Sequence, residues 1–228
     1  MKLLKYSIEW TYQTKKKIQT IISTDLLSLN ETIMLAEDFM LTGRVKQLNF
    51  ISEDGQTWTL KELKRLKEIV KDEPQNVVAY FDGGYQKSIK LAGFGAVIYY
   101  TQGGNDYRIR INEKVNELTS NNEAEYAAFL YLVNVLEEYG INKQKIVFKG
   151  DSQVVINQLS GEWPCYEEEF IIWLDRIEAK LKKLRITPEY EAITRKENNE
   201  ADKLATQAMN GIEIRSKMTL NEEVEDNE

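Results

Sequence analysis

The sequence contains no histidine and a single cysteine, Cys165. Catalysis by Ser-His-Asp or Cys-His groups is therefore excluded within the chain, because both need an imidazole. A zinc site made of cysteine and histidine is excluded for the same reason, and one cysteine cannot form an intrachain disulfide. Any bound metal must have oxygen ligands, which suit Mg²⁺, Mn²⁺ or Ca²⁺. We interpret Cys165 as a packing residue.

Long apolar runs are also missing. No uninterrupted apolar stretch approaches the roughly 18 residues that span a bilayer, and Met1 to Trp10 lacks the apolar segment of a secretion signal. We therefore expect a cytoplasmic protein with no membrane association. Apolar residues make up 42% of the 228 residues, which is typical of a folded chain once glycine is added. This length suits one large domain or two small ones.

The net charge of −7 comes from 30 basic and 37 acidic side chains. Residues 1–73 carry 12 basic and 11 acidic side chains, residues 74–211 carry 16 and 20, and residues 212–228 carry 2 and 6. This balance argues against strong nonspecific binding of nucleic acid. Because residues 212–228 are acidic and end without an apolar period, we expect a disordered tail, with self-inhibition by nucleic-acid mimicry as an alternative.

Residues 1–72 predict a small α+β domain of order ββαββα. A strand of alternating polar and apolar residues over 4–12 turns at Lys15 to Lys17 into a return strand. A helix from Ser28 or Asn30 to Met40, ended by Gly43, precedes a second hairpin. That hairpin, 45–52 with 56–59, turns at Asp54-Gly55. Thr59 and Glu62 form a capping box for a helix that reaches about Lys71.

The role of residues 1–72 stays open among nucleic-acid binding, a purely structural use of their aromatic residues and lysines, and binding of a protein partner. Tyr6, Trp10 and Trp58, together with the lysines at 15–17, could stack on bases and bind phosphates. Alternating aromatic residues on a strand are more often core, and three lysines at a hairpin tip are more often a solvated turn. A protein partner that binds through this domain is an equally simple hypothesis.

We predict a linker at 73–76, because this segment is short and polar and Pro74 cannot continue a helix. Over 77–211 the sequence predicts an α/β domain with a mixed five-stranded sheet flanked by helices. The first three strands form an antiparallel meander, and strands then alternate with helices. The predicted strands are 77–81, 93–100, 107–111, 145–149 and 186–193, and the predicted helices are 122–138, 152–159, 166–183 and 199–209.

Four acidic residues stand at strand ends or in the first turns of helices: Asp82, Glu125, Asp151 and Asp202. Strand ends are where α/β sheets place their sites. Each residue alone has a structural explanation, as a turn residue, as a complement to the helix dipole or as an N-cap. Four carboxylates in one pocket would repel one another unless cations neutralised them, so their convergence predicts bound divalent metal.

The motifs around these acids resemble those of type 1 ribonuclease H, including the reverse-transcriptase-like ribonuclease H proteins of bacteria. The resemblance covers about 77–209 and is closest to the YpeP-type proteins of Bacillus, which also carry a small N-terminal domain. The motifs are Tyr80-Phe-Asp-Gly-Gly84, Ser120-Asn-Asn-Glu-Ala-Glu-Tyr126, Gly150-Asp-Ser-Gln-Val-Val155 and Arg195-Lys-Glu-Asn-Asn-Glu-Ala-Asp-Lys-Leu-Ala205.

The resemblance implies a ribonuclease H fold and an endoribonuclease that cleaves the RNA strand of RNA·DNA hybrids with two Mg²⁺ ions, for which Mn²⁺ can substitute. It implies that Asp82 is shared by both ions, that Glu125 also contacts the ribose 2′-OH, and that Asp151 and Asp202 complete the ligand set. It further implies substrate contacts for six residues, of which Asn122 has helix capping as an equal alternative. They are Gly83, Gly84, Ser120, Asn121, Asn122 and Asn198.

Two departures from the family pattern matter. Ala192 stands where many members carry a histidine, ten residues before the last aspartate. Residues 161–169 are acidic where some members carry a basic protrusion that grips the hybrid. These departures keep a second hypothesis open, a hybrid-binding, RNA-binding or scaffolding protein with little or no catalytic activity.

Overall fold

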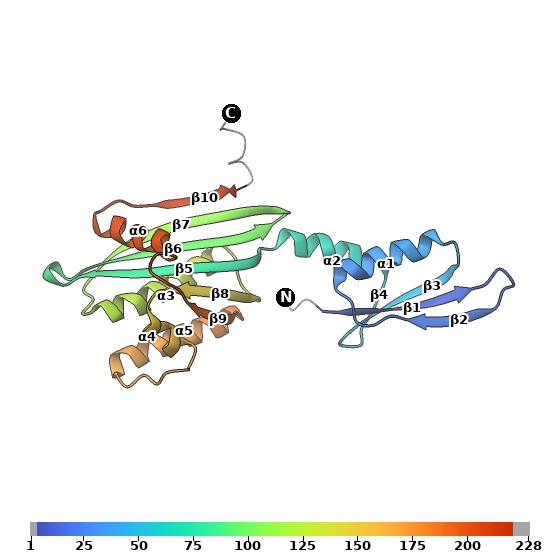
Figure 1. Ribbon diagram of the computed structural model, residues 1–228, viewed down its shortest axis with the longest axis horizontal. Coiled ribbons are helices and arrows are strands. Elements are labelled where there is room, and N and C mark those ends of the chain that lie inside the picture. Colours follow the sequence, from blue (N-terminus) through green and yellow to red (C-terminus); the bar gives the residue numbers. More distant parts are fainter. Residues whose placement is uncertain (1–3, 221–228) are drawn as a thin grey trace, which may run out of the picture. The chain divides into compact units, whose positions relative to one another are not determined.

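The computed structural model describes residues 4–220, which divide into two compact units at the boundary between Glu73 and Pro74. Figure 1 traces both units along the chain. No helix within the described range is long and apolar enough to cross a membrane.

The N-terminal unit is a four-stranded antiparallel sheet with two helices, in strand order β2-β1-β3-β4. The predicted order ββαββα is confirmed. Its elements are β1 (Tyr6–Gln13), β2 (Gln19–Ser23), α1 (Leu29–Leu41), β3 (Val45–Ser52), β4 (Thr57–Trp58) and α2 (Leu60–Asp72).

Local sequence signals place these elements. Capping boxes of Ser28 with Glu31 and of Thr59 with Glu62 begin the two helices. The alternating aromatic residues of β1 serve the core, since the Tyr6 side chain is 2% exposed and the ring of Trp10 stacks on Phe39 at 4.3 Å. Of the two interpretations of these aromatic residues, core packing is therefore the one that the structure supports for Tyr6 and Trp10.

The C-terminal unit is a six-stranded mixed sheet in order β10-β7-β6-β5-β8-β9, in which β8 is parallel to both β5 and β9. Helix α6 covers one face, and α3, α4 and α5 lie on the other (Figure 1). The elements are β5 (Gln75–Gln86), a 3₁₀ turn (Lys87–Ile89), β6 (Leu91–Gln102), β7 (Asn105–Asn116), α3 (Asn121–Glu138), β8 (Lys145–Gly150), α4 (Gln153–Leu159), α5 (Glu168–Leu184), β9 (Thr187–Ala192), α6 (Asn199–Met209) and β10 (Arg215–Thr219).

The predicted α/β class is confirmed, but the sheet has one strand more than expected. Strand β10 lies within the segment predicted to be a disordered tail and pairs antiparallel with β7. Asn112 of β7 explains its order, because its side chain donates to the Ile212 carbonyl at 3.0 Å and accepts from the Ile214 amide at 2.7 Å. The remainder of the predicted tail, residues 221–228, lies outside the described residues. Gln75, in the predicted linker, already belongs to β5.

Two helices approach the centre of the sheet so closely that only glycine fits beneath them. A Cβ atom on Gly83 of β5 would lie 2.3 Å from the Ala124 carbonyl oxygen of α3. A Cβ atom on Gly95 of β6 would lie 2.1 Å from the Ala201 carbonyl oxygen of α6. Because each alanine directly precedes an acidic residue, Glu125 or Asp202, these backbone contacts set how near the acids come to Asp82.

We expect Gly83→Ala to destabilise the protein by about 1 to 3 kcal/mol or more, since the new methyl group meets helix backbone that cannot move aside alone. Urea denaturation measures this difference. Gly84→Ala is the matched control, because its Cβ would meet the flexible end of the Met209 side chain, whose Cε lies at 2.8 Å. Equal losses for the two variants would contradict the role given to the close contact of α3.

Candidate metal centre

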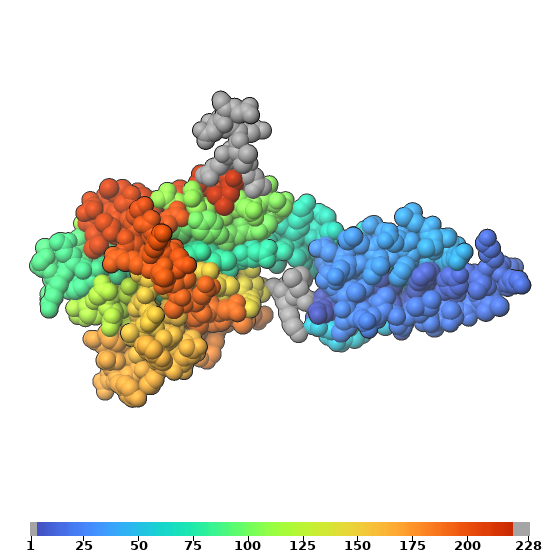
Figure 2. Space-filling model, in the orientation of Figure 1, coloured from blue at the N-terminus to red at the C-terminus, as the bar shows by residue number. Residues whose placement is uncertain are grey.

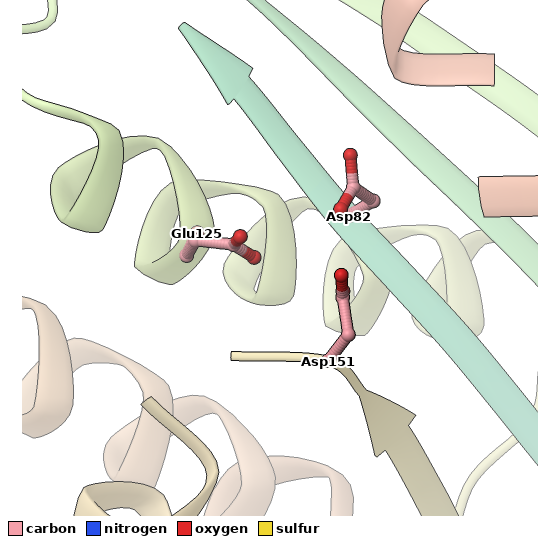
Figure 3. Close-up of side chains that lie close together, drawn as sticks. All are labelled: Asp82, Glu125 and Asp151. Atoms are coloured by element: carbon pink, nitrogen blue, oxygen red, sulfur yellow. The ribbon is translucent and has the colours of Figure 1, made fainter. Parts of the chain in front are cut away.

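Three carboxylates from separate elements converge where β8 ends beside the middle of β5 in the C-terminal sheet. Asp82 lies in β5, Glu125 in α3 and Asp151 directly after β8, and one oxygen of each lies within 4.8 Å of the others. Figure 3 shows the three side chains turned toward one another. Asp82 and Glu125 are each only 7% exposed, so the cluster sits in a largely buried position.

Strand register brings the two aspartates together. Tyr80 of β5 pairs in parallel with Lys149 of β8, and each aspartate stands two residues beyond its strand's member of this pair. Strand β8 ends at Gly150, so Asp151 leaves the sheet beside Asp82, which lies inside β5 and not after its end as predicted, because β5 continues to Gln86. Glu125 reaches the same point from α3, where the Gly83 amide donates to its carboxylate.

A buried asparagine holds Asp151 in place. The Asn198 side chain is 1% exposed, and its amide nitrogen donates to the Asp151 carboxylate at 2.7 Å and to the Phe81 carbonyl at 2.9 Å. Both partners are acceptors, which fixes the orientation of the amide. Asn198 was predicted to contact the substrate, whereas the structure uses its donors within the protein.

The fourth predicted acid, Asp202, lies close by but outside the group of three. Its carboxylate forms an ion pair with Arg195 at 2.7 Å, and the Arg195 side chain is 79% exposed. Sequence reasoning missed Arg195 as a site residue. In the sequence, Arg195 is recognisable as a basic residue seven positions before Asp202 in the last motif, but this spacing does not reveal that the two side chains form an ion pair.

The electrostatics of the cluster follow from burial and like charge. Burial, together with the nearby charges of Asp151 and Asp202, raises the pKa of Asp82 to about 7, and the charge of Arg195 opposes this rise. Burial, followed by repulsion from Asp82 and Asp151, raises the pKa of Glu125 well above its usual range. Without a cation, the cluster therefore holds protons near neutral pH.

The remaining predicted contacts lie at the start of α3 and along β5. Ser120 is the N-cap of α3, where its hydroxyl accepts from the Glu123 amide at 3.1 Å. Helix capping is therefore the role of Ser120 and not of Asn122. Asn121 and Asn122 are the first two residues of α3 and are both exposed, which leaves their side chains accessible to a ligand. Gly83 is buried beneath α3, and Gly84 is partly exposed.

The residues present fit a hard divalent cation. All the candidate ligand atoms of the three residues are carboxylate oxygens, the ligands that Mg²⁺ and Mn²⁺ prefer. The Oε2 atom of Glu125 is buried and has no hydrogen-bond partner among the described residues. A buried acceptor without a partner is costly, and a cation among the three side chains would both satisfy it and offset their repulsion.

Residues 80–208 match the protein-family model described as Reverse transcriptase-like. The match spans more than half of the chain, which therefore belongs to this family. Among curated proteins, the chain is 43% identical to YpeP of Bacillus subtilis (strain 168) over 204 residues, 89% of this chain and 90% of YpeP. This length exceeds that of the C-terminal unit, so the similarity extends into the N-terminal unit.

The chain is also similar to ribonucleases H of known sequence and structure. It is 30% identical to Ribonuclease HI of Halobacterium salinarum over 141 residues, 60% of this chain and 66% of that protein. The crystal structure of RNase H1 from Halobacterium salinarum NRC-1 superposes with a TM-score of 0.52 at 28% identity, covering 59% of this chain and 98% of that one. The predicted family and the ribonuclease H fold are thus confirmed.

We expect the metal-free protein to lose stability as the pH rises from about 4 to about 7. The folded-state pKa of Asp82, about 7, lies above its ordinary value of 3.8, so in this window the folded chain keeps a proton that the unfolded chain has released. Each unit of pKa difference corresponds to about 1.4 kcal/mol. Thermal melting in EDTA across this range, with wild type and Asp82→Asn compared, measures the effect.

Asp82→Asn should flatten that pH dependence and should be more stable than wild type at pH 8 without metal. Mg²⁺ or Mn²⁺ should raise the melting temperature of wild type, because a ligand that binds only the folded state stabilises it. The variant should lose much of this gain. If wild type and variant respond alike to the ions, the three carboxylates do not form a metal centre.

Asn198→Ala should lower the free energy of unfolding by about 1 to 3 kcal/mol, because it removes two buried hydrogen bonds and leaves Asp151 and the Phe81 carbonyl without this donor. Urea denaturation provides the measurement. Asn199→Ala, at the exposed neighbouring position, should change stability by no more than about 0.5 kcal/mol. A similar effect of both substitutions would show that Asn198 has no special positioning role.

Proposed function

We propose that this chain is a divalent-metal-dependent endoribonuclease that cleaves the RNA strand of RNA·DNA hybrids. The observation that carries the proposal is the convergence of Asp82, Glu125 and Asp151, with ligand oxygens within 4.8 Å of one another. Membership of the reverse transcriptase-like family and similarity to ribonuclease HI support the reaction class.

In this proposal Asp82, Glu125, Asp151 and Asp202 hold two Mg²⁺ ions, with Mn²⁺ as a substitute. Bound there, such a pair lowers the pKa of a water molecule and stabilises negative charge on the leaving 3′ oxygen of the RNA. The chain itself supplies the ligand oxygens and holds Asp151 through Asn198. Asp202 contributes by leaving its ion pair with Arg195, whose exposed side chain is free to move.

Substrate contacts in this proposal come from the N-terminus of α3. Asn121 and Asn122 are exposed there, one turn before Glu125, so a strand held by their amides would present its backbone to the carboxylates. The N-terminal end of a helix carries partial positive charge that favours phosphate, which supports a phosphate contact near Ser120. A Glu125 contact with the 2′-OH would restrict cleavage to RNA.

A second candidate function is binding of hybrids or RNA, or scaffolding, with little or no cleavage. The ion pair of Arg195 with Asp202 favours it, because a metal ion must compete with a cation already in place. Ala192, at the end of β9, has no titratable group to take part in proton transfer. Residues 161–169 include four glutamates and offer little electrostatic attraction to a phosphate backbone.

Cleavage of an end-labelled RNA·DNA hybrid in Mg²⁺ and in Mn²⁺ distinguishes the two functions. We expect wild type to cut the hybrid but not matched double-stranded RNA or DNA. Asp151→Asn should reduce the rate by about 10²-fold or more, since it removes a charge from the site. Asp175→Asn, which changes an exposed aspartate of α5, is the matched control and should keep wild-type activity.

Two results would contradict this prediction. Equal rates for wild type and Asp151→Asn would assign the cleavage to a contaminant or to another site. Absence of cutting in either metal, with protein well above the substrate concentration, would reject the nuclease and favour the binding or scaffolding function.

A further inference from the structure

Strand β2 forms an exposed edge of the N-terminal sheet. Within the described residues it pairs with β1 on one side and with no strand on the other (Figure 1). All five of its residues are exposed, and Figure 2 shows the β1–β2 hairpin, in deep blue, at the surface of the unit. Three isoleucines lie in or beside the strand, with exposed fractions of 66% for Ile18, 67% for Ile21 and 46% for Ile22.

The other sheet edges of the described structure carry features that hinder pairing with another chain. Strand β9 contains a proline and two glutamates, β10 contains an arginine and a lysine, and β4 has only two residues. Such residues and short lengths are the usual protection of an edge strand. Strand β2, with the sequence QTIIS, has neither charge nor proline. Of the four edges, it is the one suited to pairing.

The backbone of β2 presents a symmetric set of outward groups. The Thr24 amide donates to the Ile8 carbonyl, and the Ile18 carbonyl accepts from the Thr14 amide, so the even-numbered residues bond toward β1. In an antiparallel ladder the bonding direction alternates from residue to residue. The amide and carbonyl groups of Gln19, Ile21 and Ser23 therefore point away from β1, with Ile21 at their centre.

We propose that β2 pairs antiparallel with β2 of a second copy of this chain, about a two-fold axis at Ile21. In that register Ile21 faces its own symmetry mate, and Gln19 faces Ser23 of the other copy, so that all outward groups find partners. Lys17 and Asp25 lie two residues beyond the two ends of β2, so extending the same register brings Lys17 of each copy close to Asp25 of the other. Both residues are exposed and of opposite charge, which favours a second copy as the occupant.

The contact is small and joins two folded units, so we expect a weak dimer that forms at about 10 to 100 μM. Its stabilisation comes from burial of exposed isoleucine side chains, from the added ladder bonds and from two symmetric ion pairs. The proposal does not depend on the proposed nuclease activity, because it rests on residues of the N-terminal unit alone.

Analytical ultracentrifugation of the full chain over this concentration range, with charge variants, tests the proposal. Lys17→Asp and Asp25→Lys should each weaken the dimer about tenfold or more, because each replaces two attractive pairs by two repulsive ones. Lys17 has a φ of 64°, a conformation that aspartate tolerates. A mixture of the two variants should restore dimer formation, since each chain then offers the other opposite charges at both positions.

Matched controls separate this contact from effects of overall charge. Lys61→Asp and Asp38→Lys make the same charge changes at exposed positions of α2 and α1 and should leave the dimer unchanged. Ile21→Pro removes an outward amide without removing a bond to β1, and it should abolish the dimer while thermal melting shows a folded protein.

Several results would overturn the proposal. They are a wild type that stays monomeric at the highest concentration, a dimer that Lys17→Asp, Asp25→Lys and Ile21→Pro leave intact, and a mixture of the charge variants that stays monomeric. Restored association in the mixture, with monomers for each variant alone, would support the antiparallel register.

Discussion

The main constraint on the C-terminal unit is the repulsion among three carboxylates that the fold holds close together in a largely buried position. Asp82 and Glu125 are buried, and a carboxylate oxygen of Asp151 lies within 4.8 Å of an oxygen of each. Such an arrangement opposes folding unless protons or cations neutralise it. Rigid backbone contacts resist the repulsion, above all the direct approach of α3 to Gly83, which leaves no space for a side chain. The electrostatic repulsion is concentrated among the three carboxylates, where a bound cation would be attracted to all of them.

The surroundings of the cluster follow from the same constraint. Asn198 donates to Asp151 from a buried position, and the Gly83 amide donates to Glu125, so both carboxylates are oriented by neutral donors. Arg195 places a positive charge near Asp82 and Glu125, and it does so from the surface, paired with Asp202. A fixed buried cation would compete permanently with metal, whereas an exposed guanidinium can be displaced at little cost.

The two units have different roles in the proposed binding of nucleic acid, which is a polyanion, by a protein that is itself acidic. The C-terminal unit carries the family's fold and the carboxylate cluster, and the similarity to YpeP includes part of the N-terminal unit. A net charge of −7 gives little general attraction to nucleic acid. Pairing through β2 would join two C-terminal units in one assembly, and two weak sites acting together bind more tightly than either alone.

The sequence by itself determined the features that depend on neighbouring residues. Ser28 with Glu31 and Thr59 with Glu62 lie three residues apart and determine where the helices start. Acids predicted at strand ends and in the first turns of helices indicated the centre, although β5 continues past Asp82 to Gln86. Only the tertiary structure decided the rest. Strand β10 is ordered by Asn112, about a hundred residues away, so the acidic composition of residues 212–228 was misleading for this part of the segment. Asp202 pairs with Arg195, and Asn198 serves Asp151, because these choices depend on distances between elements that no local pattern encodes.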